Sequence, residues 1–132
     1  MSKVIHESGT RKTATARATL VAGRGVVRVN NQLASSITNP VAREKILEPV
    51  RIASDVVRRV DIDVNVDGGG TNSQSEACRV AISRALVAFD KKLEKRLLDY
   101  DRHLLVPDVR LKETHKPNHH GKARAKTQTS YR

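Results

Sequence analysis

The segment from residue 60 to residue 89 constrains the fold more than any other part of the chain. Every second residue from Val60 to Val66 is aliphatic and the residues between them are polar, which predicts a strand with one apolar face. Three glycines follow at residues 68–70. Alanine and larger apolar residues then recur at spacings of three and four up to Phe89, which predicts an amphipathic helix. A strand, a turn and a helix in succession indicate a helix packed on a sheet, so we expect a fold of α/β (α+β) class.

The start of this helix offers two kinds of signal. Ser73 and Glu76 have the spacing of a reciprocal capping pair, which predicts that the helix begins there. Gly68, Gly69 and Gly70 form a candidate phosphate-binding turn, because N–H groups at a helix start attract anions. The alternative is a turn that close packing of strand and helix requires. No Gly-Lys-Ser/Thr sequence follows, which excludes a nucleotide P-loop.

Patterns before this segment predict a hairpin and a helix. Residues 13–20 alternate and residues 26–29 are β-branched, so with the glycines of residues 23–25 between them they predict an antiparallel hairpin. Asn39-Pro40 predicts the start of a helix over residues 41–55. Pro49 lies inside that helix, so we expect a kink or a break near Glu48.

Two further elements are expected after the central helix. Residues 91–100 predict a more polar helix, and residues 104–106 predict a short last strand. Together the elements form a single small layer in which helices cover one face of a sheet. The other face is free to meet a partner.

Charge divides the chain into a body and two ends. The net charge of +11 is concentrated as +3 in the first 20 residues and +6 in the last 23, and the segment between them is nearly balanced. We therefore predict a basic N-terminal extension over residues 1–12, a globular domain over 13–106 and a basic extended tail over 107–132. Proteases should trim the isolated protein before about Thr13 and after about Pro107.

Basic ends of this kind typically bind nucleic acid, because phosphate contacts release condensed counterions. No aromatic platform accompanies the cations, so we expect contacts to phosphates rather than to bases. The alternative is a charge run that only adds solubility. The candidate RNA-binding residues are Arg11, Lys12, Arg17, Lys112, Lys116, Lys122, Arg124 and Lys126.

Several other functions find little support in the residues. The longest apolar run, residues 85–89, is far shorter than the roughly 20 residues of a membrane span, and no apolar stretch follows Met1, so we expect a soluble intracellular protein without a membrane partner. Asp61 and Asp63 share a strand face, yet no acid, base or nucleophile accompanies them, so a solvated face is favoured over catalysis. We assign no catalytic residue, no cofactor and no small-molecule substrate.

Histidines and the single cysteine do not indicate a metal site. His115, His119 and His120 lie in a polar tail without a cysteine partner, which favours polar contacts near phosphate over metal ligation. Cys78 has no second cysteine with which to pair, and we expect it to be a small core residue.

Longer motifs resemble a known family. Residues 68–77 and the following Ala81-Ile82-Ser83-Arg84-Ala85-Leu86 resemble the signature of the small-subunit ribosomal protein S9 family, in which a glycine triplet leads to an alanine-rich helix ending in Arg-Ala-Leu. Residues 9–18 resemble the same family's entry strand. Residues 99–102 and 130–132 resemble its archaeal and eukaryotic branch. The chain departs from the pattern at Ser73, where glycine is frequent, and at residues 127–129, where Thr-Gln-Thr replaces Phe-Gln-Lys.

This resemblance implies a fold of the ribosomal S5 domain 2 type and a place in the head of the small subunit, on the cytoplasmic ribosome. It implies small-subunit rRNA and neighbouring ribosomal proteins as partners. It also implies that Ser130, Tyr131 and Arg132 contact the anticodon region of the peptidyl-site (P-site) tRNA.

Two other classes of function stay open at this point. The fold type also houses small-molecule kinases, which need a phosphate loop and a catalytic acid that this sequence does not display. A free RNA- or DNA-binding regulator is the stronger alternative, and it would bind a defined site without the ribosome.

Overall fold

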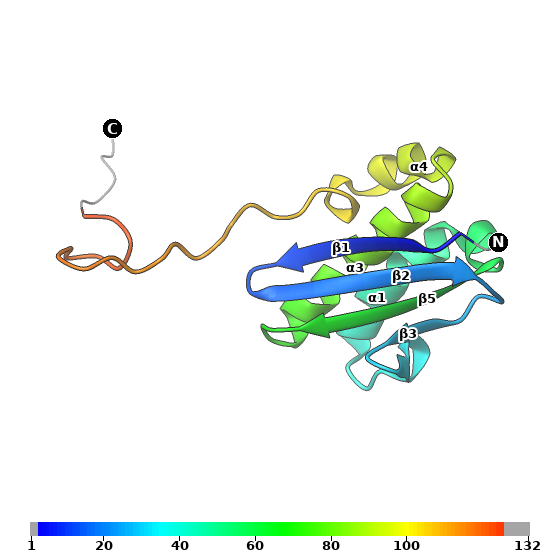
Figure 1. Ribbon diagram of the computed structural model, residues 1–132, viewed down its shortest axis with the longest axis horizontal. Coiled ribbons are helices and arrows are strands. Elements are labelled where there is room, and N and C mark those ends of the chain that lie inside the picture. The colour runs from blue at the N-terminus through cyan, green and yellow to red at the C-terminus, as the bar shows by residue number, and fades with distance from the viewer. Residues whose placement is uncertain (1–2, 126–132) are drawn as a thin grey trace.

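The computed structural model describes residues 3–125 and consists of one mixed sheet with helices on one face (Figure 1). Five strands lie in the order β1-β2-β5-β3-β4. Their bounds are Ile5–Arg11 for β1, Ala14–Ala22 for β2, Val27–Val29 for β3, Gln32–Leu33 for β4 and Val60–Asp67 for β5. The α/β class predicted from the sequence is confirmed.

Four α-helices and two short 3₁₀ helices complete the body. The α-helices are α1 (Pro40–Ile52), α2 (Ser54–Val57), α3 (Thr71–Phe89) and α4 (Lys92–Tyr100), and the 3₁₀ helices are η1 (Ala34–Ser36) and η2 (Arg102–Leu104). Figure 1 shows α1 and α3 behind the sheet, with α4 beyond the edge strand β1.

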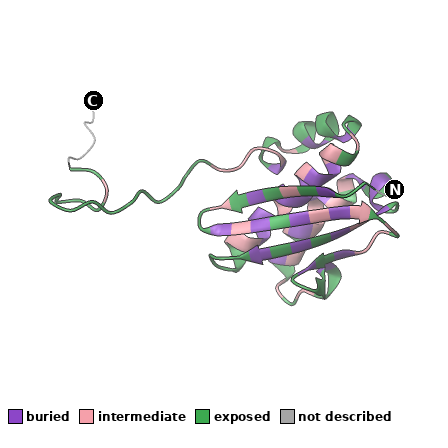
Figure 2. Cartoon of the chain, viewed as in Figure 1, coloured by how far each residue is buried: buried purple, intermediate pink, exposed green. Residues whose placement is uncertain are grey.

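The core lies between α3 and the sheet, and it is aliphatic. Buried residues alternate with half-buried or exposed ones along β2 and β5, as Figure 2 shows. Helix α3 faces them with Ala77, Ala81 and Ala85, all completely buried. Small side chains there let the helix backbone approach the sheet closely. The largest fully buried side chains include Leu20, Ile62, Ile82, Leu86, Leu93, Leu97 and Leu104.

The N-terminal extension predicted for residues 1–12 is wrong, because residues 5–11 form edge strand β1. This strand pairs with β2 in an antiparallel register from Ile5–Leu20 to Arg11–Ala14. Gly9 lies so close to α3 that a Cβ atom there would come within 2.5 Å of the Ala77 carbonyl oxygen. The segment carries few large apolar side chains, so its pattern did not indicate a strand. Backbone pairing and the close contact with α3 fix it in the body.

The antiparallel hairpin expected between residues 13–20 and 26–29 is also wrong. Strand β5 lies between the two segments, antiparallel to β2 and parallel to β3. The hairpin was predicted from neighbouring segments alone. Strand β5, which is distant in sequence, inserts between them because its apolar side chains face the core while both of its edges form backbone hydrogen bonds. The loop between β2 and β3 instead wraps the start of β5, where Arg24 N and Val26 N donate to Asp61 Oδ1 at 2.9 and 3.0 Å.

Helix α1 begins as expected but breaks later than expected. Asn39 Oδ1 accepts hydrogen bonds from Val41 N and Ala42 N, at 3.1 and 3.3 Å, and caps the helix. The helix then continues through Pro49 to Ile52. The expected break near Glu48 is wrong, since α2 starts only after Ala53, whose N–H bonds to the Pro49 carbonyl.

Two further predictions differ from the structure: the start of the helix after the glycine triplet, and the short last strand over residues 104–106. Helix α3 starts at Thr71 with Gly70 as its N-cap, so Ser73 and Glu76 lie inside the helix and form no capping pair. Ion pairs engage Glu76 instead. Residues 102–104 form η2 rather than the start of a strand, because Asp101 caps them through His103 N at 2.9 Å and Leu104 is buried. The helix predicted over residues 91–100 is confirmed as α4.

Candidate nucleic-acid interface

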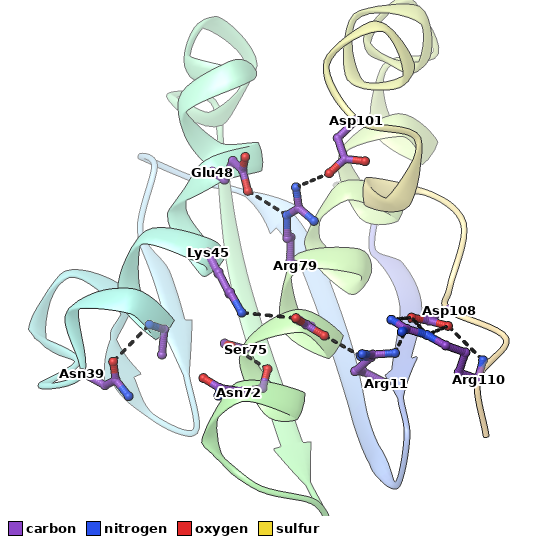
Figure 3. Close-up of polar contacts among 12 residues, drawn as sticks. Arg11, Asn39, Lys45, Glu48, Asn72, Ser75, Arg79, Asp101, Asp108 and Arg110 are labelled. Atoms are coloured by element: carbon purple, nitrogen blue, oxygen red, sulfur yellow. Dashed lines mark hydrogen bonds and ion pairs between the residues drawn. The ribbon is translucent and has the colours of Figure 1, made fainter. Parts of the chain in front are cut away.

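A network of ion pairs fixes the point where the tail leaves the body. Arg11, the last residue of β1, contacts two carboxylates: its Nε lies 2.5 Å from Glu76 Oε2 on α3, and its Nη1 pairs with Asp108 (Figure 3). Lys45 of α1 pairs with the other oxygen of Glu76 at 3.2 Å. Arg110 donates to Asp108 from Nη2 at 2.6 Å. The first residues of the tail are therefore bound to β1 and, through Glu76, to α3 and α1.

Arg11 has two carboxylate partners within the chain. The sequence placed it among the phosphate-binding residues, and in the structure its side chain is 15% exposed and pairs with Glu76 and Asp108. These ion pairs link β1 to the start of the tail, and phosphate binding by Arg11 stays a prediction. The sequence analysis did not single out Glu76 as an ion-pairing residue or Asp108 at all. An available signal was that only two acids, Asp108 and Glu113, interrupt the basic tail.

A second ion pair network holds the segment before the tail. Arg79 of α3 lies between Glu48 of α1 and Asp101, with Nε–Oε2 and Nη2–Oδ2 distances of 2.8 and 2.9 Å (Figure 3). Arg84 donates to the carbonyl oxygens of Ser8 and Leu105 at 2.9 and 3.3 Å. Helix α3 thus ties β1 and α1 to the chain on either side of η2.

Acid should loosen these networks. Burial raises the pKa of Glu76, but hydrogen bonds from Lys45 and Arg11 outweigh it, and the pKa is lowered overall. Burial likewise raises the pKa of Asp101, and bonds from His103 N and Arg79 lower it overall. The hydrogen bond from the Arg110 side chain holds the pKa of Asp108 far below its usual range. Each carboxylate binds protons more readily in the unfolded chain than in the folded one.

The stabilisation by these carboxylates is therefore complete above the unfolded pKa values of about 4, and it is lost as pH falls through the lower folded values. We expect the Tm to fall steadily as the pH is lowered from 5 toward 2, measured by circular dichroism. The Glu76→Gln variant should start from a lower Tm at pH 5 and lose less of it on acidification. A Tm that declines equally in both proteins would contradict a role for Glu76 in the acid response.

The tail projects from the body without helix or strand over residues 107–125 (Figure 1). Part of it folds back: Lys116 N donates to the Lys122 carbonyl at 2.8 Å, and Arg124 Nη2 pairs with Glu113 Oε1 at 2.6 Å. The hydrogen bond from Arg124 also lowers the pKa of Glu113. Both acids of the tail thus have arginine partners, which leaves its lysines to carry the unbalanced positive charge.

The remaining predicted cations are exposed. Lys12 occupies the β1–β2 turn with a φ of 54°, and Arg17 lies on the open face of the sheet, opposite Asn65 of β5. Within residues 3–125, no carboxylate pairs with Lys12, Arg17, Lys112, Lys116 or Lys122. The structure brings Lys12 and the first tail residues, 107–110, to the same end of the body, and it leaves Arg17 apart from them. We call residues 107–110 the tail root. Lys126, Ser130, Tyr131 and Arg132 lie outside the described residues.

The glycine triplet lies at this same end, and packing accounts for most of it. Gly68 has a φ of 76°, and a Cβ atom there would overlap the Thr13 carbonyl oxygen of the β1–β2 turn. Gln74 Nε2 donates back to the Gly68 carbonyl at 3.1 Å and holds the turn. Gly70 differs, because nothing lies within 4 Å of the position of its Cβ. The first two glycines thus serve the strand–helix connection, whereas the third leaves the start of α3 open.

The structure also places the acidic residues and the cysteine that the sequence analysis considered. Asp61 binds the β2–β3 loop, and the Val26 N–H bond, ahead of that from Arg24, lowers its pKa. Asp63 is exposed on the sheet. Cys78 is buried, and burial raises the pKa of its thiol to about 12. Among residues 3–125, no three potential metal-ligating side chains gather, and no helix has the length and apolar content needed to cross a bilayer.

Exposed lysines without carboxylate partners in the described part of the chain, on and beside a projecting basic tail, give this α/β body the charge distribution that is common among nucleic-acid-binding proteins. Comparison with known proteins identifies the family. The family model for ribosomal protein S9/S16 matches residues 9–132. Small ribosomal subunit protein uS9 of Methanococcus vannielii is 43% identical over 133 residues, which cover 98% of this chain and 99% of that protein. The uS9 protein of Thermoplasma volcanium is 46% identical over 127 residues, covering 95% of this chain and 96% of that protein.

The chain belongs to the S9 family of small-subunit ribosomal proteins, as the sequence motifs indicated. It is a structural constituent of the small ribosomal subunit on the cytoplasmic ribosome, and it is not an enzyme. A third archaeal relative, uS9 of Methanococcus maripaludis, is also 43% identical, over 98% of this chain.

Proposed function

We propose that this protein binds small-subunit rRNA in the head of the subunit, through phosphates, at the end of the body from which the tail leaves. The observation that supports this proposal most directly is the contrast between paired and unpaired cations. Arg11 and Arg110 are satisfied by carboxylates and fix the tail root, whereas Lys12, Lys112, Lys116 and Lys122 are exposed and have no carboxylate partner among residues 3–125.

The chemistry favours phosphates over bases. The lysine ammonium group is a point charge without a planar edge, and residues 107–125 contain no Phe, Tyr or Trp. Such contacts position a protein on RNA without reading its sequence. Because ion pairs fix the start of the tail, its lysines extend from one end of the body.

Other ribosomal proteins are proposed to contact the open face of the sheet. Asp63 and Asp67 of β5 are exposed there, among exposed Arg17 and Arg28 of the neighbouring strands, and the two acids repel phosphate. A protein neighbour that carries both kinds of charge fits this part of the face better than a continuous RNA backbone does.

The end of the tail is proposed to contact the P-site tRNA, as the family resemblance implies. Arg132 would bind the backbone of the anticodon stem-loop, with Lys126 as an electrostatic anchor and Tyr131 packed on sugar or RNA. The net gain from this contact is on the order of 1 kcal/mol.

Deleting Ser130–Arg132 should therefore weaken retention of P-site tRNA by about three- to tenfold, while the subunit still assembles. Filter binding of tRNA to purified small subunits at several salt concentrations measures the affinity. Sucrose-gradient sedimentation of the tagged variant is the control for assembly. Equal tRNA affinity with and without the three residues would remove the tRNA contact from the proposal and leave rRNA binding in place.

A further inference from the structure

A second group of cations lies at the end of the body away from the tail. We call it the basic corner; its members are Arg24, Arg58, Arg59, Lys91, Lys92 and Lys95, all exposed. Strand β2 joins the two ends, running nine residues from Ala14 beside the β1–β2 turn to Ala22 beside the corner. At about 3.3 Å per residue the ends lie roughly 26 Å apart. The corner is therefore separate from the surface already described.

Three chain segments distant in sequence build the corner. The loop between β2 and β3 is held against the start of β5, with Gly23 N donating to the Arg59 carbonyl at 3.0 Å and Gly25 N to the Val60 carbonyl at 2.9 Å. The Arg59 guanidinium carbon lies 5.9 Å from the centre of the Phe89 ring at the end of α3. Arg24 and Arg59 are thus placed beside the turn that leads into α4.

The start of α4 completes the corner. Lys91 is the N-cap of α4, and its spacing of four from Lys95, with the spacing of three between Lys92 and Lys95, makes Lys95 a neighbour of both. Arg96 fixes the start of α4 to the body, since its Nη1 lies 3.1 Å from Asp55 Oδ1 and donates to the Ile52 carbonyl at 3.2 Å. The lysines are therefore carried on an anchored helix rather than on a mobile loop.

Nearby acids leave the corner positive. Asp61 Oδ1 accepts two backbone N–H bonds from the β2–β3 loop, Asp90 Oδ1 accepts one from Lys92 N at 3.1 Å, and Asp55 pairs with Arg96. Within residues 3–125 no carboxylate forms an ion pair with any of the six cations. Their six charges exceed those of Asp61, Asp90 and Glu94, the carboxylates that have no ion-pair partner there.

The groove between α1 and α4 shows the opposite arrangement. It has a volume of about 720 Å³, and its cations Lys45 and Arg51 both pair with carboxylates, Glu76 and Glu44. Charged side chains are thus used in two ways on this protein. Those of the groove neutralise each other in ion pairs, whereas the cations of the basic corner are exposed without ion-pair partners among residues 3–125.

We infer that the basic corner is a second phosphate-binding site, which holds a stretch of RNA distinct from the one bound at the tail end. The inference rests on the proposed function, because it takes its ligand from the RNA of the subunit. Six cations without ion-pair partners in the part of the chain that the structure describes, against three nearby carboxylates, give an anchored surface whose excess positive charge fits the phosphodiester backbone of RNA. The open face between the two ends is mixed in charge, because exposed Asp63 and Asp67 of β5 lie among exposed Arg17 and Arg28 of the neighbouring strands. It therefore offers one RNA backbone no continuous positive track from end to end. The body therefore bridges two RNA segments.

Directed hydroxyl-radical probing tests the two sites within one assembled subunit. The single native Cys78 is buried with a raised pKa, so a cysteine introduced by Arg58→Cys or Lys122→Cys takes an iron–EDTA probe selectively. The wild-type protein, treated identically, supplies the background. We expect cleavage of one stretch of small-subunit rRNA from position 58 and of another from position 122.

The outcomes separate this inference from the proposed function. Cleavage from position 122 alone, or cleavage of the same stretch from both positions, overturns the second site and leaves the tail interface standing. A second outcome also overturns the inference: the probe at position 58 cleaves no RNA and a neighbouring protein covers that position. The corner would then bind an acidic protein partner. Absence of cleavage from both positions would count against the proposed function as well.

Charge variants give an independent measure. Replacing Lys91, Lys92 and Lys95 together by glutamine should reduce the log–log salt slope for binding transcribed small-subunit rRNA by roughly 2 to 2.7, at about 0.7 to 0.9 per lost phosphate contact. The matched variant with arginine at the same three positions keeps the charge and should keep the slope. Circular dichroism melting confirms that both variants fold. A glutamine variant that is folded and keeps the wild-type slope would contradict the site.

Discussion

Ending the chain at Arg110 should reduce its affinity for small-subunit rRNA by at least about a hundredfold and lower the log–log salt slope by roughly 4 to 5. The truncation removes six cations and one acid but retains Asp108, and so keeps the contacts among Arg11, Asp108 and Arg110. Any loss then reflects missing phosphate contacts rather than a disturbed body. Filter binding to transcribed rRNA over a series of salt concentrations measures both quantities.

A matched control keeps the length of the tail. The full-length chain with Lys112→Gln, Lys116→Gln and Lys122→Gln should lose about 2 to 2.7 of the slope, part of the effect of truncation. The Tm of both variants should stay close to that of the wild type, since residues 111–125 are exposed apart from Ala123. If the truncated protein bound rRNA with the full salt slope, the tail would have no phosphate-binding role.

Replacing Gly9 by alanine should cost about 2 to 3 kcal/mol of unfolding free energy and lower the Tm by roughly 10 to 20 °C. The added Cβ would lie 2.5 Å from the Ala77 carbonyl oxygen and 2.6 Å from Ala81 N, both backbone atoms of α3. Backbone in a buried helix cannot yield as a flexible side chain does, so β1 must move away from α3. Denaturant titration followed by circular dichroism measures the change.

The same substitution at Gly70 is the control. Nothing lies within 4 Å of its Cβ position and its φ is −102°, so Gly70→Ala should cost less than about 1 kcal/mol. A Gly9→Ala protein as stable as Gly70→Ala would mean that β1 is a peripheral strand. It would then restore the N-terminal extension that the sequence predicted.

Patterns within a short stretch of chain were sufficient for several elements. The alternation of Val60–Val66 is confirmed as β5, and Asn39-Pro40 marks the capped start of α1. Where the sequence analysis was wrong, the deciding contact came from a distant segment. Glu76 has the spacing of a capping residue, but Arg11 and Lys45 engage it from two other elements.

The basic residues show the same division. A count of charged residues along the chain located the basic tail, and the shortage of apolar residues there predicted that its lysines are exposed. It could not separate Arg11, which two internal carboxylates neutralise, from Lys12 beside it. Nor could it show the basic corner, because residues 24, 58–59 and 91–95 lie in a segment whose total charge is nearly balanced. Folding brings the cations of the basic corner together, while the nearby carboxylates of Asp61 and Asp90 accept hydrogen bonds from backbone N–H groups.

By itself the sequence determined the fold class, the family and the basic character of the tail, since these depend on local periodicity, on motifs and on composition. The tertiary structure alone decided the strand order β1-β2-β5-β3-β4, the place of residues 5–11 in the sheet and which arginines form ion pairs. The physical reason is that a strand's partners and a charge's neighbours are set by contacts between residues far apart in the chain. Those contacts exist only after the apolar faces of β2, β5 and α3 have packed together.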